Sequence, residues 1–186
     1  MKIVHEVLVP LTKIVMDSSA LILLAKCGLM GIVCELFEVI SPSSVMAEVA
    51  SKEMIIKYPD AALINELTSK KKIKIQDHKS AGFHLPLSLH KGEKDAILLA
   101  MEIKNSIFAT DDGKAIKAAR FLKIPFIISP KIVIELYKLQ KITFKVARES
   151  IGKLNTIGRY SPDIIASALV SLMEGENDKT YNHKVT

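Results

Sequence analysis

Five carboxylates lie at or near the ends of apolar runs in the sequence, and they are the side chains best able to do chemistry: Asp17, Glu48, Asp95, Asp111 and Asp112. Asp111 and Asp112 are adjacent, so their charges repel, most strongly if a buried strand ends there in a crevice. Converging carboxylates without a matching Lys or Arg are costly unless they become protonated or bind a cation. We therefore expect at least one of them to have a raised pKa in the metal-free protein. Oxygen ligands without Cys favour Mg²⁺ or Mn²⁺, as one or two ions.

Basic residues flank these acids and could hold the phosphates of a polyanionic partner: Lys114, Lys117 and Arg120 after the acidic pair, and Lys91 and Lys94 beside Asp95. An ordinary solvated helix face would show the same pattern, so both interpretations stay open. The net charge of +6 and the pI near 9.2 agree with a nucleic-acid partner but do not require one. Because there is no Trp and only 5% of residues are aromatic, we expect phosphate contacts and no stacking platform for bases.

Two kinds of segment must position these side chains. Short apolar runs at 13–16, 38–40, 72–76, 106–110 and 125–129 predict strands, and segments with helical spacing lie between them. This alternation predicts an α/β fold with a parallel sheet covered on both faces, in which ligands bind at the carboxyl ends of the strands. Asp17 and the acidic pair follow such strands directly. Glu48 and Asp95 lie in neighbouring helices, so four chain segments could deliver acids to one edge.

Helical geometry separates the acids of the segment at 92–105. Glu93 and Asp95 are about 200° apart around an ideal helix, so both can hardly contact one metal ion. Asp95 shares a face with the apolar Leu99 and should face the sheet edge, whereas Glu93 should stabilise the helix N-terminus. Thr110 could orient a neighbouring carboxylate, or its hydroxyl could bond to the backbone at the strand end.

Capping residues predict where two helices begin. Ser18 or Ser19 is a plausible N-cap of the first helix, and Asp17, taken alone, is itself expected to be a helix cap. Ser41 is the expected cap of a helix that opens at Pro42 and runs on towards residue 57.

Four motifs resemble those of a PIN domain in both order and spacing: "IVMDSSALI", "SPSSVMAEV", "GEKDAILLA" and "FATDDGKAIKAA". They are most similar to the archaeal and bacterial branch that includes VapC-type toxin ribonucleases, and the resemblance covers roughly residues 13–129. It implies a three-layer α/β/α sandwich with a central parallel sheet of about five short strands, followed by C-terminal helices. The "GE-x-D/E-A" form belongs to a less characterised branch, so a toxin role does not follow automatically.

The resemblance also assigns roles to the acids. Asp17 matches the family's Asp after the first strand, Glu48 its helical Glu, Asp95 the acid of its third motif, and Asp112 its final acid. These four are the implied catalytic residues and metal ligands. Asp111 occupies a variable position and is a further candidate ligand. Ser19 matches a small polar residue that supports the metal shell.

The resemblance implies a divalent-metal-dependent nuclease that hydrolyses phosphodiester bonds, above all an endoribonuclease, with toxin-type action as one form. RNA is the expected partner, and a small antitoxin protein or a second copy of the chain are further expected partners. The alternative is a PIN-like module that binds nucleic acid or protein with weak or no catalysis. Two other classes of protein are disfavoured because the sequence lacks a feature that each needs. A haloacid-dehalogenase-like phosphatase would need an Asp in place of Ser19, and a dinucleotide site would need a glycine-rich turn after a strand.

The expected organisation is a nuclease domain at 13–129, a helical extension at 130–173 packed on the same domain, and a flexible polar tail at 174–186. The start of the chain does not resemble a signal peptide, and no uncharged apolar run approaches the roughly 18 residues of a membrane span. We therefore expect a cytoplasmic protein without a membrane partner.

Overall fold

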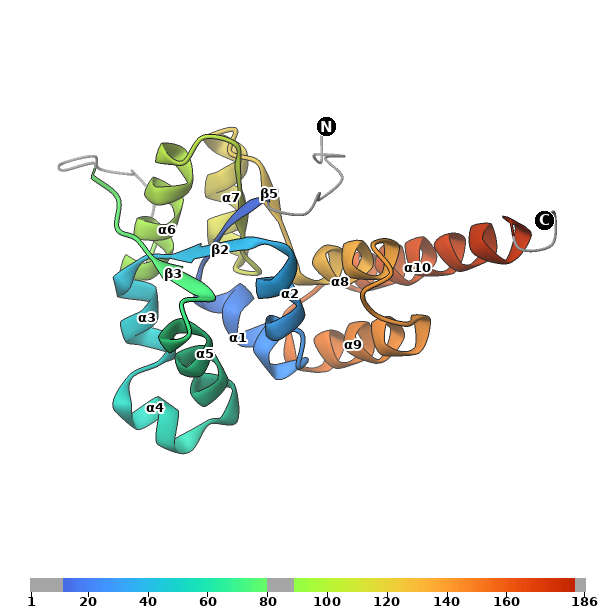
Figure 1. Ribbon diagram of the computed structural model, residues 1–186. Coiled ribbons are helices and arrows are strands. Elements are labelled where there is room, and N and C mark those ends of the chain that lie inside the picture. The colour runs from blue at the N-terminus through green and yellow to red at the C-terminus, as the bar shows by residue number, and fades with distance from the viewer. Residues whose placement is uncertain (1–11, 80–88, 183–186) are drawn as a thin grey trace. The chain divides into compact units, whose positions relative to one another are not determined.

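The computed structural model of the chain describes residues 12–79 and 89–182, with side chains described as far as residue 176. The chain divides into two compact units between Ile128 and Ser129 (Figure 1). Most of the predicted loop between His78 and His90 lies outside the described residues, as do residues 1–11 and 183–186.

The first unit is a three-layer α/β/α sandwich around a five-stranded, all-parallel sheet, as the sequence predicted. Its strands are β1 (Lys13–Met16), β2 (Glu38–Ser41), β3 (Ile73–Ile75), β4 (Ser106–Ala109) and β5 (Phe126–Ile127). They lie in the order β3-β2-β1-β4-β5. The sequences of β1 and β4 are almost continuously apolar because a parallel sheet covered on both faces buries nearly every position.

The helices of this unit connect the strands and cover the sheet. They are α1 (Ser18–Lys26), α2 (Met30–Leu36), α3 (Ser43–Val49), α4 (Lys52–Lys57), α5 (Pro59–Ser69), α6 (Lys91–Glu102) and α7 (Gly113–Phe121). Helix α1 packs on β1, α3 and α5, while α6 packs on β1, β4 and α3. The two strands that end at the predicted acids are thus contacted by α1 and α6.

The start of α1 follows one of the alternatives that the sequence left open. Its N-cap is Asp17, whose Oδ1 accepts a hydrogen bond from the Ala20 amide at 3.0 Å. Neither serine is the cap, because each hydroxyl donates to a carboxylate instead. Ser18 donates to Glu48, and Ser19 donates to Asp17, each at 2.7 Å.

The helical stretch after β2 differs from the prediction. Ser41 is the last residue of β2, and its hydroxyl donates to the Met16 carbonyl at 2.9 Å instead of capping a helix. The N-cap position of α3 is Pro42. The predicted single helix is broken, because Ser51 caps a new helix, α4, through a bond from the Met54 amide.

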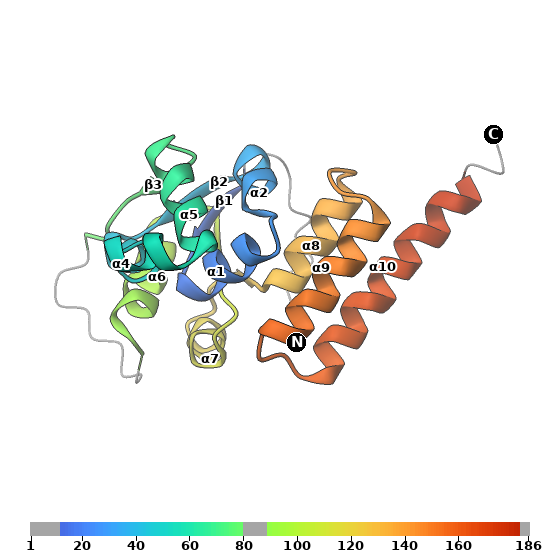
Figure 2. The same cartoon turned by 90° about the horizontal axis from the view of Figure 1, so that it is seen from below.

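The second unit consists of helices that pack on one another in pairs: α8 (Ser129–Lys138), α9 (Phe144–Ile157) and α10 (Pro162–Asn182). The ring of Tyr137 meets that of Phe144 edge-on, with centroids 6.2 Å apart, and its hydroxyl donates to Glu176. The sequence predicted a flexible tail from residue 174, but α10 continues as helix to Asn182 (Figure 2).

Among the residues that the structure describes, no single helix is long and apolar enough to cross a membrane, and α1 and α2 meet that criterion only together, across a bend of 116°.

The acids lie at the switch point of the sheet. From β1 the chain goes to β2 and β3 on one side and then crosses to β4 and β5 on the other. The carboxyl ends of strands at such a point open a crevice in which α/β proteins bind ligands. Met16 is in register with Ala109, and the Asp17 amide donates to the Ala109 carbonyl at 3.2 Å. Asp17 and residues 110–112 therefore leave the sheet next to each other.

Candidate functional site

Asp17 is the most constrained acid of the site. It is 1% exposed, and three groups donate to its carboxylate. Oδ1 accepts from the Ser19 hydroxyl at 2.7 Å and the Ala20 amide at 3.0 Å, and Oδ2 accepts from the Thr110 hydroxyl at 2.5 Å. The side chain is thus fixed by its own helix start and by the end of the neighbouring strand.

Burial raises the pKa of Asp17 from an ordinary value of 3.8 to about 7. The hydrogen bonds from Thr110, Ser19 and Ala20 oppose this rise, and the negative charge of Asp111 adds to it as the smallest cause. The expected raised pKa is confirmed, but its cause is mainly loss of hydration and only slightly repulsion between the acids. A nearby cation would favour the charged form of this carboxyl.

The loop after β4 is tied to Asp17 through two hydroxyl groups. Thr110 not only donates to Asp17 but also accepts from the Asp112 amide at 3.2 Å. The Asp111 amide donates to the Ser19 hydroxyl at 2.8 Å. Thr110 thus orients a neighbouring carboxylate, which was one of its two predicted roles. We call Asp17, Ser19, Thr110 and Asp112 the strand-end cluster.

Asp112 is also the N-cap of α7. Its Oδ1 accepts from the amides of Lys114 at 2.7 Å and Ala115 at 3.0 Å. The helix dipole favours a negative charge at this position. Backbone amides therefore stabilise the negative charge of Asp112 without a metal ion.

Glu48 lies between the strand-end cluster and α6. Its Oε2 accepts from Ser18 and lies only 3.0 Å from where a Cβ on Gly92 would be. That Cβ would also lie 3.2 Å from Val45. A side chain at position 92 would therefore press on the Glu48 carboxylate. Gly92 was not among the predicted site residues, although a glycine in the first turn of a helix was a signal for such a close approach.

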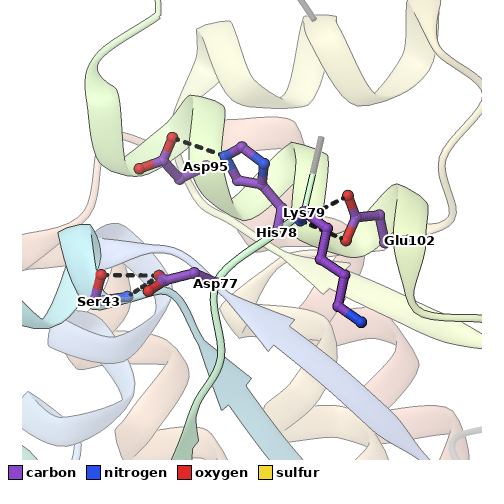
Figure 3. A network of polar contacts seen from close by, with 6 residues as sticks. All are labelled: Ser43, Asp77, His78, Lys79, Asp95 and Glu102. Carbon is purple, nitrogen blue, oxygen red and sulfur yellow. Dashed lines mark hydrogen bonds and ion pairs between the residues drawn. The ribbon is translucent and has the colours of Figure 1, made fainter. Parts of the chain in front are cut away.

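Asp95 has a different environment. Its Oδ1 lies 3.4 Å from Nε2 of His78, which is at the limit for a hydrogen bond (Figure 3). We call His78 and Asp95 the α6 pair. Glu93, two residues earlier, accepts from the His90 amide at 3.0 Å, so it stabilises the helix N-terminus as predicted.

Residues on either side of His78 hold it near Asp95. Asp77 accepts from the amide and the hydroxyl of Ser43, both at 2.8 Å, and these bonds lower its pKa. The Lys79 amide donates to both carboxylate oxygens of Glu102 at 2.9 Å. The segment Asp77–Lys79, which we call the strap, is thereby tied to the start of α3 and along α6 (Figure 3).

The predicted metal ligands do not all converge in this conformation. Hydrogen bonds link Asp17 to Asp112 through Thr110, and the adjacent serines link Asp17 to Glu48. Within residues 12–79 and 89–182, no three His, Cys, Asp or Glu side chains are placed so that they could hold a metal ion.

The donors nevertheless suit a hard cation. In the described part of the chain, Asp17, Glu48 and Asp112 form no ion pair with Lys or Arg. Carboxylate oxygens without a basic partner match the ligand preference of Mg²⁺ and Mn²⁺. The donor set therefore fits such an ion chemically, and binding by all the acids would require side-chain movement.

The predicted basic residues lie at the surface. Lys91, Lys114, Lys117 and Arg120 are exposed, and Lys94 is half-buried. The Arg120 guanidinium lies over the Phe126 ring, 5.6 Å from its centroid. Arg120 is thus already engaged, whereas the two lysines of α7 extend into solvent.

The fold and the site place the protein among parallel α/β proteins that carry an acidic site at the switch point of the sheet. The family model DUF3368, described as a PIN domain, matches residues 13–174. The chain belongs to this PIN domain family. Searches of curated proteins and of solved structures give no match.

Proposed function

We propose that the protein is a divalent-metal-dependent nuclease, and specifically an endoribonuclease that hydrolyses phosphodiester bonds. PIN domains are nucleases in general, and membership of that family supports the class of reaction. The observation that carries the proposal is Asp17, a buried carboxylate held by three donors beside Asp112 and linked through Ser18 and Ser19 to Glu48.

Asp17, Glu48, Asp95 and Asp112 would hold Mg²⁺ or Mn²⁺, with Asp111 at the margin of the site. When bound, the metal supplies charge neutralisation and the activation of water for attack on phosphorus. Ser19 and Thr110 keep the Asp17 carboxylate in one orientation. Ser18 does the same for Glu48.

Lys91, Lys94, Lys114 and Lys117 would hold substrate phosphates next to these acids. RNA as the substrate, a toxin-type role, an antitoxin or second copy as partner, and a cytoplasmic location stay predictions. A binding module without catalysis would use the same basic residues, so only a test of cleavage separates the two functions.

The test is cleavage of end-labelled single-stranded RNA, single-stranded DNA and duplex DNA by the full chain, with Mn²⁺, Mg²⁺ or EDTA. We expect RNA cleavage that needs metal and is lost in Asp17→Asn, with the variant's circular dichroism unchanged. Binding of RNA without cleavage under any metal condition would indicate the binding module. If the chain neither bound nor cleaved any of these substrates, the nuclease proposal would be refuted.

A further inference from the structure

Helix α7 ends in an exposed aromatic ring. Phe121 is the last residue of the helix and is 73% exposed. One apolar side chain at a surface is ordinary and carries no meaning alone. The neighbours of Phe121 on the helix give it significance.

Two exposed lysines share the ring's side of α7. Lys117 and Phe121 are four residues apart, and Lys114 and Lys117 are three apart, so successive members are neighbours on the helix surface. Ala115 and Ala119, which are buried, lie on the side of the helix that faces away from these three residues. We call Lys114, Lys117 and Phe121 the α7 stripe.

The α7 stripe starts at the acids. The helix begins directly after Asp112, its N-cap, and Phe121 lies eight residues beyond Gly113, or about 12 Å along the axis. A chain-like ligand that lies along this helix from the acids would therefore meet two positive charges and then a flat apolar ring.

Single-stranded nucleic acid has the matching chemistry. Its phosphates suit the lysines, and its unpaired bases present faces that stack on aromatic rings. A duplex hides those faces, and an acidic peptide offers charge without a series of flat rings. The second ring at this end of α7, Phe126, is half-buried and already covered by Arg120, so it is less accessible than Phe121.

We propose that Phe121 stacks on a base of single-stranded RNA while Lys114 and Lys117 hold the phosphates between that base and the acids. This surface rests on the proposed nuclease function and deepens it, because it selects unpaired RNA. It also revises the expectation from composition that no base would stack on this protein. One well-placed ring is sufficient for a single stacked base.

The test is the affinity of the full chain for a fluorescent single-stranded RNA oligomer in EDTA, measured by anisotropy across a salt series. Phe121→Ala should weaken binding about 5- to 20-fold, the lower part of the range for a stacked base. The slope of log affinity against log salt should not change, since no phosphate contact is lost. Lys114→Ala and Lys117→Ala should each make that slope shallower by about 0.7.

Matched variants separate stacking from general apolar contact. Phe121→Tyr keeps the ring and should bind like wild type, whereas Phe121→Leu keeps the apolar bulk and should bind like Phe121→Ala. Ile56→Ala removes another side chain that is 88% exposed and lies on a helix bounded by lysines, and it should leave affinity unchanged. The affinity for duplex RNA should not change in Phe121→Ala.

Specific outcomes would overturn the proposal. Equal affinity of wild type, Phe121→Leu and Phe121→Ala would refute stacking while leaving the nuclease proposal intact if wild type still cleaves RNA. A change from dimer to monomer in Phe121→Ala, with RNA affinity unaltered, would assign the ring to an interface between copies. Phe121-dependent binding without metal-dependent cleavage would support the α7 stripe and refute only the catalytic function.

Discussion

The strand-end cluster and the α6 pair carry acids of the same proposed site, yet they are built differently. Asp17 in the cluster accepts three hydrogen bonds of 2.5 to 3.0 Å and is 1% exposed. Asp95 in the pair has a 3.4 Å contact with His78 and is partly exposed. The cluster therefore holds its carboxylate in place before a metal binds, whereas the orientation of Asp95 depends on the strap.

The difference follows from how each part is connected. Asp17 and Thr110 extend from adjacent strands whose register is fixed by the sheet, so their separation is set by backbone hydrogen bonds. His78 belongs to an irregular segment that is held by Ser43 and Glu102. A cation that binds Asp95 would compete with His78 for the same carboxylate.

The largest expected effect is the loss of catalysis in Asp17→Asn. The variant keeps the shape and can still accept hydrogen bonds, but it removes one anionic ligand. We expect metal-dependent RNA cleavage to fall about 100-fold or more, as when a group that stabilises developing charge is removed. Single-turnover rates in Mn²⁺ measure this. A folded variant that cleaves at the wild-type rate would exclude Asp17 from the site.

A smaller effect should distinguish the cluster from the α6 pair. Thr110→Val removes the short bond to Asp17, and loss of such a supporting bond costs about 10- to 100-fold in metal affinity or activity. His78→Ala removes a 3.4 Å contact and should change both quantities less. If His78→Ala lost more activity than Thr110→Val at equal melting temperature, the α6 pair would support the site more than the strand-end cluster does, contrary to this prediction.

The pH dependence of stability tests the burial of Asp17. Its folded pKa of about 7 exceeds the ordinary value of 3.8, so the folded state binds more protons between these values. The contribution of Asp17 to the free energy of unfolding is fully present below about pH 4 and is lost as the pH rises through about 7. The loss amounts to roughly 1.4 kcal/mol per unit of difference between the folded and unfolded pKa values. Urea unfolding in EDTA should show this fall in wild type and a flatter profile in Asp17→Asn. Parallel profiles would contradict the raised pKa.

The smallest effect is expected at Gly92, the residue of α6 that lies against the Glu48 carboxylate. Gly92→Ala would place a Cβ 3.0 Å from Glu48 Oε2, and the flexible carboxylate can shift by a few tenths of an ångström. We expect a loss of Mn²⁺ affinity of only about 2- to 5-fold, less than one hydrogen bond is worth. Calorimetric titration of the variant measures this. An affinity equal to wild type would show that Glu48 tolerates the shift or is not a ligand.

Local patterns predicted much of this architecture. The apolar runs that end at Asp17 and Thr110 gave the two central strands, because a buried parallel strand has a distinctive composition. The cap of α1 was harder to predict, since Asp17, Ser18 and Ser19 can all cap a helix. The choice is decided by Glu48, thirty residues away, which engages Ser18.

Other features depend on contacts that no local pattern encodes. The sequence predicted a loop from His78 onwards and gave no sign of the strap. The bonds of the strap to Ser43 and Glu102 join residues far apart in the chain. Low aromatic content argued against stacking, but composition does not indicate that Phe121 is exposed beside two lysines. The polar composition after residue 174 suggested a tail, whereas α10 continues there as helix.

The most direct measurement is the calorimetric titration of Mn²⁺ into metal-free wild type, Asp17→Asn and Asp95→Asn at one pH. If the strand-end cluster and the α6 pair share a metal site, wild type should bind Mn²⁺ and each variant should bind it at least about 10-fold more weakly. If Asp95→Asn binds Mn²⁺ as tightly as wild type, Asp95 is not part of the metal site, and the proposed union of the two regions is wrong.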